Sequence, residues 1–366
     1  MTFIPLGSPN ITEKDIENVS AVLRSGMLVQ GKNVADLEKI FAEYHGVKHA
    51  TAVANGTATL HLALLVSGIG KGDEVIIPAF SYIATANVVE LTGATPVFTD
   101  IDPDTFNIDV NKIERKITPN TKAIIPVHEF GLACDIERIA FLARKYNLVL
   151  IEDAACALGA RQNGKPAGSF GNFGSFSLHP RKSITSGEGG ILLTNDTEKD
   201  RKLKAFRNHG IDPGKTDMDF IEAGFNYRMT DFQAALVLGQ FERLEKNLEY
   251  KNELAEIYFS EIKNPKIKLP VVPDGFNHTW QTFHVLLADS LKQRDVIIKL
   301  KEKNIGTNYG AQCIPSQTYY AKKYKFDVKK DFPNSYRAYS QGLAIPIYEK
   351  LSKEQLYYIA KCLNEL

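Results

Sequence analysis

Residues 174–190 read Gly174-Ser175-Phe176-Ser177-Leu178-His179-Pro180-Arg181-Lys182-Ser183-Ile184-Thr185-Ser186-Gly187-Glu188-Gly189-Gly190. A short apolar run opens this stretch, a proline and one lysine follow, and a Gly-Glu-Gly-Gly turn closes it before the chain becomes apolar again. Glycines after Lys182 and a proline before it indicate an irregular backbone that holds one amine in a defined place. A lone lysine is most often a solvated side chain, so the neighbouring motifs must support a chemical role for it.

Apolar, β-rich runs recur on both sides of this stretch. The expected strands cover residues 50–54, 74–77, 95–100, 123–127, 148–152, 175–178 and 191–194. Helical periodicity fills several of the gaps, most clearly at 135–144, where we expect Asp135 to be the N-cap. Strands buried on both faces have continuous apolar sequences like these. The pattern predicts an α/β fold with a mostly parallel central sheet flanked by helices.

The pattern changes after Gly224. Thr230 and Gln233 have the spacing of a capping box and predict a long helix that continues through Leu244 and beyond. The remainder is typical of a smaller α+β unit, with a strand at 282–287, a helix at 292–303, an irregular loop at 309–315 and a last helix from Lys353. We predict a large domain over residues 1–250 and a small C-terminal domain over 251–366, with the boundary placed to within about ten residues.

The charge balance argues against nucleic acid or an anionic membrane as a partner. Lys and Arg number 44 and Asp and Glu number 43, which gives a net charge of +1, and no block of one sign occurs. No apolar run approaches the roughly 20 residues of a spanning helix, and residues 1–9 lack the pattern of a signal peptide. The four cysteines are scattered without a C-x-x-C pair. We expect a cytoplasmic protein with reduced thiols.

Thr12 and Gly26 predict the start and end of a first helix. Residues 26–33 then mimic the spacing of a P-loop, but Asn33 stands where a magnesium-binding Ser or Thr should be, and a helix rather than a strand precedes them. We therefore reject a nucleotide-binding loop here and expect no metal site.

Two turns should join the lysine at the carboxyl ends of the strands, where parallel sheets bind their ligands. Asn55-Gly56-Thr57-Ala58 lies between a strand and an apolar helix, and the amides at the start of that helix suit a phosphate group. An ordinary capped turn has the same pattern. Ser177 precedes Lys182 by five positions and can share the same phosphate. Phe80-Ser81-Tyr82 supplies an aromatic ring that can stack on a flat heteroaromatic ligand or pack in the core.

Val149-Leu150-Ile151-Glu152-Asp153 is a buried strand that ends in two carboxylates. A carboxylate at this tip can keep a pyridine nitrogen protonated. A magnesium-binding acid would need the P-loop that we rejected, and a simple capping Asp is the remaining alternative. Together these motifs predict that Lys182 forms a Schiff base with pyridoxal phosphate, leaves it to an incoming amine, and then moves a proton as a base.

The same motifs, in the same order, resemble the DegT-type nucleotide-sugar aminotransferases. They are Asn55-Gly56-Thr57, Gly72-Asp73-Glu74-Val75-Ile76-Ile77-Pro78, Gly93-Ala94-Thr95-Pro96-Val97, Glu152-Asp153-Ala154-Ala155, Phe176-Ser177, Lys182, Gly187-Glu188-Gly189-Gly190 and Asn226-Tyr227-Arg228-Met229-Thr230-Asp231. The match extends to about residue 250 and continues more weakly beyond it.

The resemblance implies a fold-type I, pyridoxal-phosphate-dependent homodimer with shared active sites. It implies that Lys182 carries the cofactor, that Asp153 pairs with the ring nitrogen and that Tyr82 stacks on the ring. The implied phosphate contacts are Gly56, Thr57, Ala58 and Ser177, with Asn226 reaching the cofactor of the neighbouring subunit. Arg228 and Tyr309 are the expected substrate contacts. An ordinary lead-in to a helix is the alternative for residues 226–228.

The implied reaction moves an amino group from L-glutamate to a nucleotide-linked ketosugar. The closest resemblance is to transaminases that form dTDP-4-amino-4,6-dideoxyglucose, which implies a dTDP-4-keto-6-deoxyhexose substrate and a product for surface polysaccharide such as lipopolysaccharide O-antigen. Lys182 is retained, whereas relatives with histidine there dehydrate their sugar. A 3-amino product, a non-catalytic regulator that binds pyridoxal phosphate, and an ATPase built on Asp153 remain alternatives.

Two positions depart from the family pattern. Cys156 stands three residues after Asp153, where the family commonly has a Gln that supports the phenolic oxygen of the cofactor. Residues 308–315 read Asn-Tyr-Gly-Ala-Gln-Cys-Ile-Pro in place of the more usual His-Tyr-Pro form, so sugar recognition by this loop is open.

Overall fold

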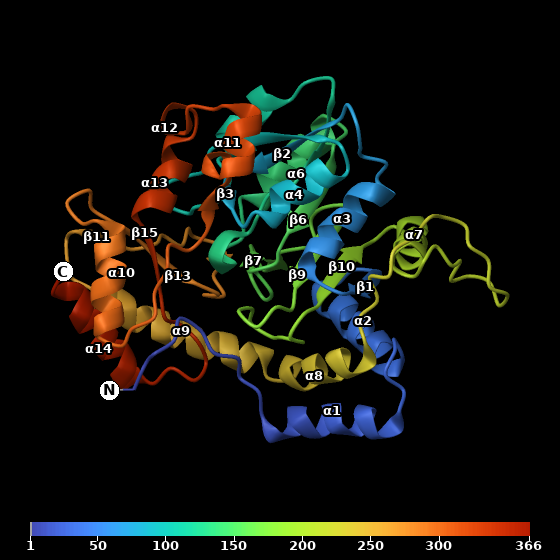
Figure 1. Ribbon diagram of the computed structural model, residues 1–366, viewed down its shortest axis with the longest axis horizontal. Coiled ribbons are helices and arrows are strands. Elements are labelled where there is room, and N and C mark those ends of the chain that lie inside the picture. The colour runs from blue at the N-terminus through green and yellow to red at the C-terminus, as the bar shows by residue number, and fades with distance from the viewer. Residues whose placement is uncertain (1) are drawn as a thin grey trace.

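A seven-stranded sheet forms the centre of the computed structural model, which describes residues 2–366 (Figure 1). Met1, the first residue of the stretch 1–9 considered above, lies outside the described residues. The strand order is β1 (His49–Val53), β10 (Gly190–Thr194), β9 (Phe173–Ser177), β6 (Val149–Asp153), β5 (Thr121–Ile124), β2 (Glu74–Pro78) and β4 (Thr95–Thr99). Neighbours from β9 to β4 are parallel, and β10 runs antiparallel to β1 and β9. The predicted mostly parallel sheet is confirmed.

Alternate side chains of the strands enter cores on opposite faces of this sheet. In β10, Leu192 packs into one core, whereas Ile191 and Leu193 pack into another, as the two-residue period of a strand requires. The first core contains α3 (Gly56–Val66), α4 (Ala84–Leu91) and α7 (Thr197–Arg207). The opposite face is covered by α2 (Lys32–His45), α6 (Ile136–Lys145) and α8 (Asp231–Phe241). Helices therefore flank the sheet on both sides.

A smaller antiparallel sheet organises the C-terminal part. It consists of β11 (Ile267–Lys268), β13 (Phe283–Leu287) and β15 (Gly342–Ile345), and packs with α9 (Leu244–Glu261), α10 (Gln293–Glu302) and α14 (Lys353–Asn364). Ile4 belongs to this core, and Tyr320 and Phe332 return to the core of the large sheet. Residue 250 lies inside α9, and the division at 1–250 and 251–366 stays a prediction.

The remaining helices and strands complete the described chain. They are α1 (Glu13–Ser25), β3 (Phe80–Ser81), α5 (Val110–Ile113), η1 (Glu114–Lys116), η2 (Glu129–Gly131), β7 (Arg161–Gln162), β8 (Lys165–Pro166), β12 (Phe276–Asn277), β14 (Gln312–Cys313), η3 (Ile314–Ser316), α11 (Thr318–Tyr324), α12 (Val328–Asp331) and α13 (Pro333–Gln341). Within residues 2–366, every helix is too short or too polar to cross a membrane.

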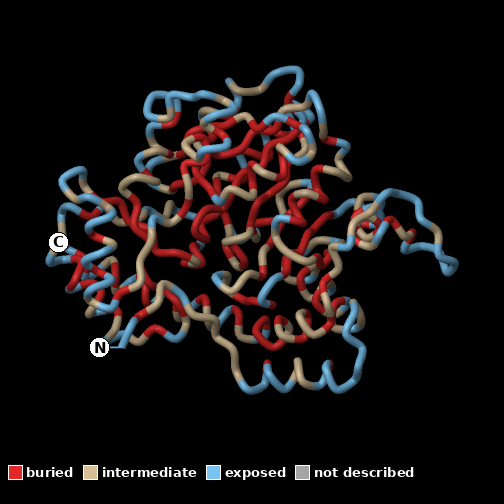
Figure 2. Tube along the Cα trace, in the orientation of Figure 1, coloured by how far each residue is buried: buried red, intermediate tan, exposed pale blue. Residues whose placement is uncertain are grey.

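Residues 208–226, called the arm below, project from the body beside α7 (Figure 1). Most of the arm is exposed (Figure 2), and its apolar side chains Met218 and Phe220 are 73% and 59% exposed. Backbone bridges join Asn208 to Asn226 and Ile211 to Phe220. The arm is therefore an ordered projection that carries apolar side chains in solvent.

Two helix predictions need correction. Asp135 occupies the N-cap position of α6 but makes no capping bond; Gln162 Oε1 instead accepts from the N–H groups of Ile136 and Glu137 at 2.9 and 3.3 Å. The helix predicted to run from Thr230 beyond Leu244 is interrupted between α8 and α9. In this break, Arg243 Nη2 donates to Asp15 of α1 at 2.7 Å. In both places a contact between distant parts of the chain accompanies the difference.

Candidate active site

The lysine loop leaves β9 and is held by bonds at both ends. The N–H of Lys182 donates to the His179 carbonyl at 2.8 Å, which forms a turn after the proline. Gln240 of α8 accepts from the N–H of Thr185 at 3.0 Å and donates to its carbonyl at 2.8 Å. At the side-chain end, Nζ of Lys182 donates to Sγ of Cys156 at 3.0 Å. These contacts place one amine in a defined position.

A cavity of about 650 Å³ opens around this amine at the carboxyl ends of the strands. All the predicted cofactor residues except Asn226 line it, namely Gly56, Thr57, Ala58, Tyr82, Asp153, Ser177 and Lys182. Tyr82 is 65% exposed within this lining, so most of its ring surface is open to a ligand. The separate sequence motifs therefore meet at one place.

The start of α3 and the end of β9 form a narrow cradle at one side of the cavity. A Cβ on Gly56 would lie 2.8 Å from the Cβ of Ser177, so only glycine allows this approach. Asn55 Oδ1 caps α3 by accepting from the N–H of Ala58 at 2.9 Å. None of the described residues accepts from the N–H groups of Gly56 and Thr57. Two free amides, two hydroxyls and a helix N-terminus suit a phosphate group.

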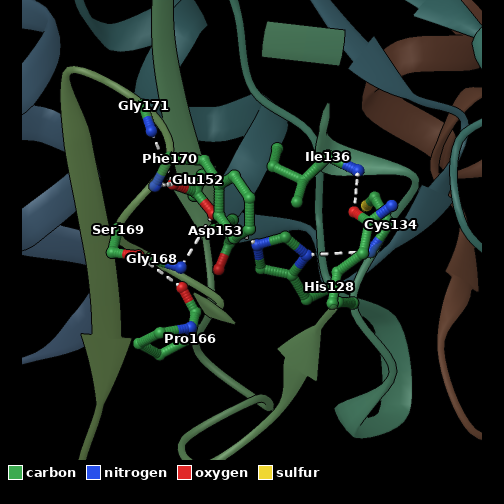
Figure 3. Close-up of polar contacts among 12 residues, drawn as sticks. His128, Cys134, Ile136, Glu152, Asp153, Pro166, Gly168, Ser169, Phe170 and Gly171 are labelled. Carbon is green, nitrogen blue, oxygen red and sulfur yellow. Dashed lines mark hydrogen bonds and ion pairs between the residues drawn. The ribbon is translucent and has the colours of Figure 1, made fainter. Parts of the chain in front are cut away.

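The two carboxylates that end β6 point in opposite directions. Glu152 lies away from the cavity and accepts hydrogen bonds from the N–H groups of Gly168, Phe170 and Gly171 at 2.7, 2.6 and 2.7 Å (Figure 3). Asp153 lines the cavity, where its carboxylate accepts from the Thr85 hydroxyl at 2.9 Å. Burial raises the pKa of Asp153, and the bond from Thr85 opposes that rise. Only Asp153 is therefore available to a ligand.

His128 connects Glu152 to the turn after β5. Its Nδ1 accepts from the N–H of Cys134 at 3.0 Å, so a neutral ring carries its proton on Nε2. Nε2 lies 3.0 Å from Glu152 Oε2, and both side chains are fully buried (Figure 3). This network fixes the strand end beneath Asp153.

The sequence analysis missed Thr85 and Glu129 as lining residues. Glu129 follows β5, is 5% exposed and lines the cavity. Burial and the charge of Asp153 raise the pKa of Glu129 to about 8. Phe130 next to it has φ of 58°, a left-handed conformation uncommon for a bulky residue. The position of Glu129 just after a strand end is the signal that could have identified it.

Three predicted residues lie away from the cavity lining of a single chain. Asn226 is exposed at the base of the arm, and Arg228 donates from Nη1 to Asn208. The ring of Tyr309 packs against Tyr339 with centroids 5.5 Å apart. Its neighbours in the 308–315 loop, Gly310 and Ala311, do line the cavity.

In this fold-type I architecture, one amine, one cavity-facing carboxylate and a glycine cradle at a helix N-terminus converge on one cavity. Residues 9–364 match the model of the DegT/DnrJ/EryC1/StrS aminotransferase family, and the chain belongs to this family. The family depends on pyridoxal phosphate, and the chain is therefore a sugar aminotransferase that acts on nucleotide sugars. The cavity fits this cofactor, because the cradle at Gly56 matches a phosphate and the free face of Asp153 matches a protonated ring nitrogen.

Several similar proteins match the whole chain or nearly all of it. It is 37% identical over 367 residues to GDP-perosamine synthase of Escherichia coli O157:H7, covering 100% of this chain and 99% of the relative. It is 35% identical over 382 residues to UDP-4-amino-4-deoxy-L-arabinose–oxoglutarate aminotransferase of Shewanella sediminis, covering 100% and 98%. The pyridoxal-phosphate form of the sugar aminotransferase Spr1654 from Streptococcus pneumoniae superposes with a TM-score of 0.93 at 29% identity, covering 99% of this chain and 98% of that chain.

Proposed function

We propose that this protein transfers the amino group of L-glutamate to the C4 keto group of a nucleotide-linked 4-keto-6-deoxyhexose, giving a 4-amino-4,6-dideoxyhexose for surface polysaccharide. The observation that carries this proposal is the convergence of Lys182, Asp153 and the Gly56–Ser177 cradle on one cavity. The name of the Shewanella relative specifies a 4-amino sugar and oxoglutarate, which supports both the position of the amine and the donor.

Each residue then has a distinct task. Pyridoxal phosphate supplies an aldehyde that binds amines and a ring that accepts an electron pair. Lys182 holds the cofactor and, once displaced, takes and returns the proton at the substrate carbon. Asp153 keeps the ring nitrogen protonated, Tyr82 covers the ring, and the Gly56, Thr57 and Ser177 cradle anchors the phosphate.

The proposed unit is a homodimer in which each arm completes the site of the other subunit. The arm exposes Met218, Phe220 and Ile221, of which the first two are more than half exposed, and apolar patches of this kind mark protein contacts. Asn226 and Arg228 lie at its base, outside the cavity of their own chain. An association through the arm would bring them to the second cavity, with Arg228 and Tyr309 contacting the sugar nucleotide.

The nucleotide of the substrate is tested separately from the position of the amine. The two relatives described above carry GDP and UDP in their names, and dTDP rests on the sequence resemblance alone. The test incubates the protein with L-glutamate and matched GDP-, UDP- and dTDP-linked 4-keto-6-deoxyhexoses and locates the new amine by NMR. We expect 2-oxoglutarate and a C4 amine in equal amounts. Amination of a 3-keto isomer alone would favour the 3-amino alternative, and cofactor binding without turnover would favour a regulator.

A further inference from the structure

Glu129 is a buried acid in the cavity to which the reaction outlined above gives no task. Its Oε2 has no hydrogen-bond partner among residues 2–366, although the side chain is 5% exposed. The backbone around it is held firmly, since its N–H donates to Asn107 Oδ1 at 2.8 Å. A buried polar atom without a partner is costly, which indicates that a ligand supplies the missing contact.

The order of the strands places Glu129 opposite the phosphate cradle. Asp153 ends β6, the strand between β9 and β5. Ser177 of the cradle ends β9 on one side of Asp153, and Glu129 follows β5 on the other side. The three side chains line one cavity, so a ring centred on Asp153 has one edge toward Ser177 and the other toward Glu129.

The substituents of pyridoxal phosphate have a matching order. Its aldehyde carbon lies across the ring from the nitrogen, and the carbons on either side of it carry the phosphate arm and the phenolic oxygen. With the phosphate at Ser177 and the nitrogen at Asp153, the phenolic oxygen faces the β5 side. We propose that Glu129 is a cofactor-binding residue whose protonated carboxyl donates a hydrogen bond to this phenolic oxygen. The proposal rests on the proposed function, which brings this cofactor to the cavity.

The surroundings of Glu129 keep a proton on it at neutral pH. Burial has the largest effect and the Asp153 carboxylate the next, and together they raise its pKa to about 8, against the charge of Lys182 and hydrogen bonds from the Ser81 hydroxyl and the Phe130 N–H. The other titratable groups that face it are the thiols of Cys156 and Cys134, whose pKa values are also raised by burial. A protonated carboxyl is a donor, whereas an ionised one could only accept.

Cys156 is a poor candidate for the hydrogen-bond donor to the phenolic oxygen. It stands where the family resemblance has a Gln. A thiol is a weak hydrogen-bond donor compared with an amide. Glu129, which begins η2 after the neighbouring strand β5, is thus the group that can replace the missing amide.

The test is a pH titration of the visible absorbance of the cofactor-loaded protein. A hydrogen bond donated to the phenolic oxygen draws its negative charge away from the proton on the neighbouring Lys182 nitrogen. That nitrogen then loses its proton at a lower pH, so removing the donor should raise the midpoint of the titration. We expect Glu129→Leu and Glu129→Met each to raise it by about one pH unit. Glu129→Gln keeps a donor and should stay within about 0.3 unit of the wild type. Adding Cys156→Gln to Glu129→Leu should return the midpoint toward the wild-type value.

The role of Glu129 would be overturned if the midpoint did not change in Glu129→Leu and Glu129→Met. It would also be overturned if Glu129→Gln shifted the midpoint as much as these two variants do. Thermal unfolding of each loaded variant verifies that the compared proteins are folded, and the Leu and Met variants guard against a single misfolded substitution. Glu256→Gln, an exposed position on α9, is the matched control and should not shift. A wild-type protein without any visible band would instead overturn the proposed function, so the two failures are distinguishable.

Discussion

The side-chain nitrogen of Lys182 lies 3.0 Å from the sulfur of Cys156. These residues come from different loops, one after β9 and the other after β6, and their contact orients the amine toward the same cavity as Asp153. The pair thus links the Lys182 amine to the chain that follows β6, the strand that carries Asp153 into the cavity. It also makes Cys156 a reporter of the state of the site.

Cys156 should be the first thiol to be alkylated in the cofactor-free protein. Cys134, Cys313 and Cys362 are buried, whereas Cys156 is only partly so. Burial raises the pKa of Cys156 and the charge of Lys182 lowers it, so Lys182→Met should slow labelling at pH 8 about three- to tenfold. Peptide mass mapping of iodoacetamide adducts measures this, with Lys299→Met as the exposed control. Equal labelling of the buried cysteines would contradict the prediction.

Glu152 should matter for stability rather than for the reaction. Replacing it with Ala removes the acceptor of three N–H groups, the buried one of Gly168 and the partly buried ones of Phe170 and Gly171. We expect the free energy of unfolding to fall by about 3 to 5 kcal/mol, as measured by urea denaturation. Glu256→Ala on the exposed face of α9 should change it by less than about 0.5 kcal/mol. A loss of the same size in both variants would show that the network is not stabilising.

Glu129 should make the stability of the cofactor-free protein depend on pH. The pKa of its carboxyl is 4.5 in an unfolded chain, and burial raises this pKa to about 8 in the folded protein. Between these values the unfolded state has released the proton and the folded state still holds it, so stability falls as pH rises. Glu129→Gln has no titrating carboxyl here and therefore lacks this loss of stability. The difference in free energy of unfolding between Glu129→Gln and wild type should therefore grow from pH 5 to pH 8, by on the order of a few kcal/mol. Urea denaturation of both proteins at pH 5 and pH 8 measures this difference. The same difference in free energy of unfolding at both pH values would contradict the prediction.

Shared active sites should allow two inactive variants to restore each other. In a dimer that pairs Lys182→Ala with Asn226→Ala, one site carries both defects and the other carries neither. Random exchange of subunits should therefore return about a quarter of the wild-type activity. The control mixes Lys182→Ala with Asp153→Ala, which lie in the same chain's cavity, and should return none. Recovery in both mixtures, or in neither, would argue against the proposed arrangement.

The local sequence was sufficient to predict the strands and the helix starts of the main architecture. Each predicted strand overlaps an observed one, and Thr12 and Thr230 form the capping boxes that their spacing predicted. Buried parallel strands and caps depend on neighbouring residues, which is why they could be predicted. Asp135 was the wrong capping group because Gln162, 26 residues away from Ile136, supplies the acceptor.

The site was predictable where a residue stands in a strand-end motif. Gly56, Asp153, Ser177 and Lys182 line one cavity as expected. Glu129 also follows a strand end, but its place opposite Ser177 depends on the order of strands in the sheet, which the chain order does not reveal. Asn226, Arg228 and Tyr309 remain predictions, since their proposed contacts require a second subunit.

The central claim is that Lys182 carries the cofactor. The direct measurement is to load the protein with pyridoxal phosphate, reduce it with borohydride and locate the added phosphopyridoxyl group by peptide mass spectrometry. We predict one modified residue, Lys182, and no stable label in Lys182→Ala. A label at another lysine such as Lys251, or none in the wild-type protein, would contradict the account.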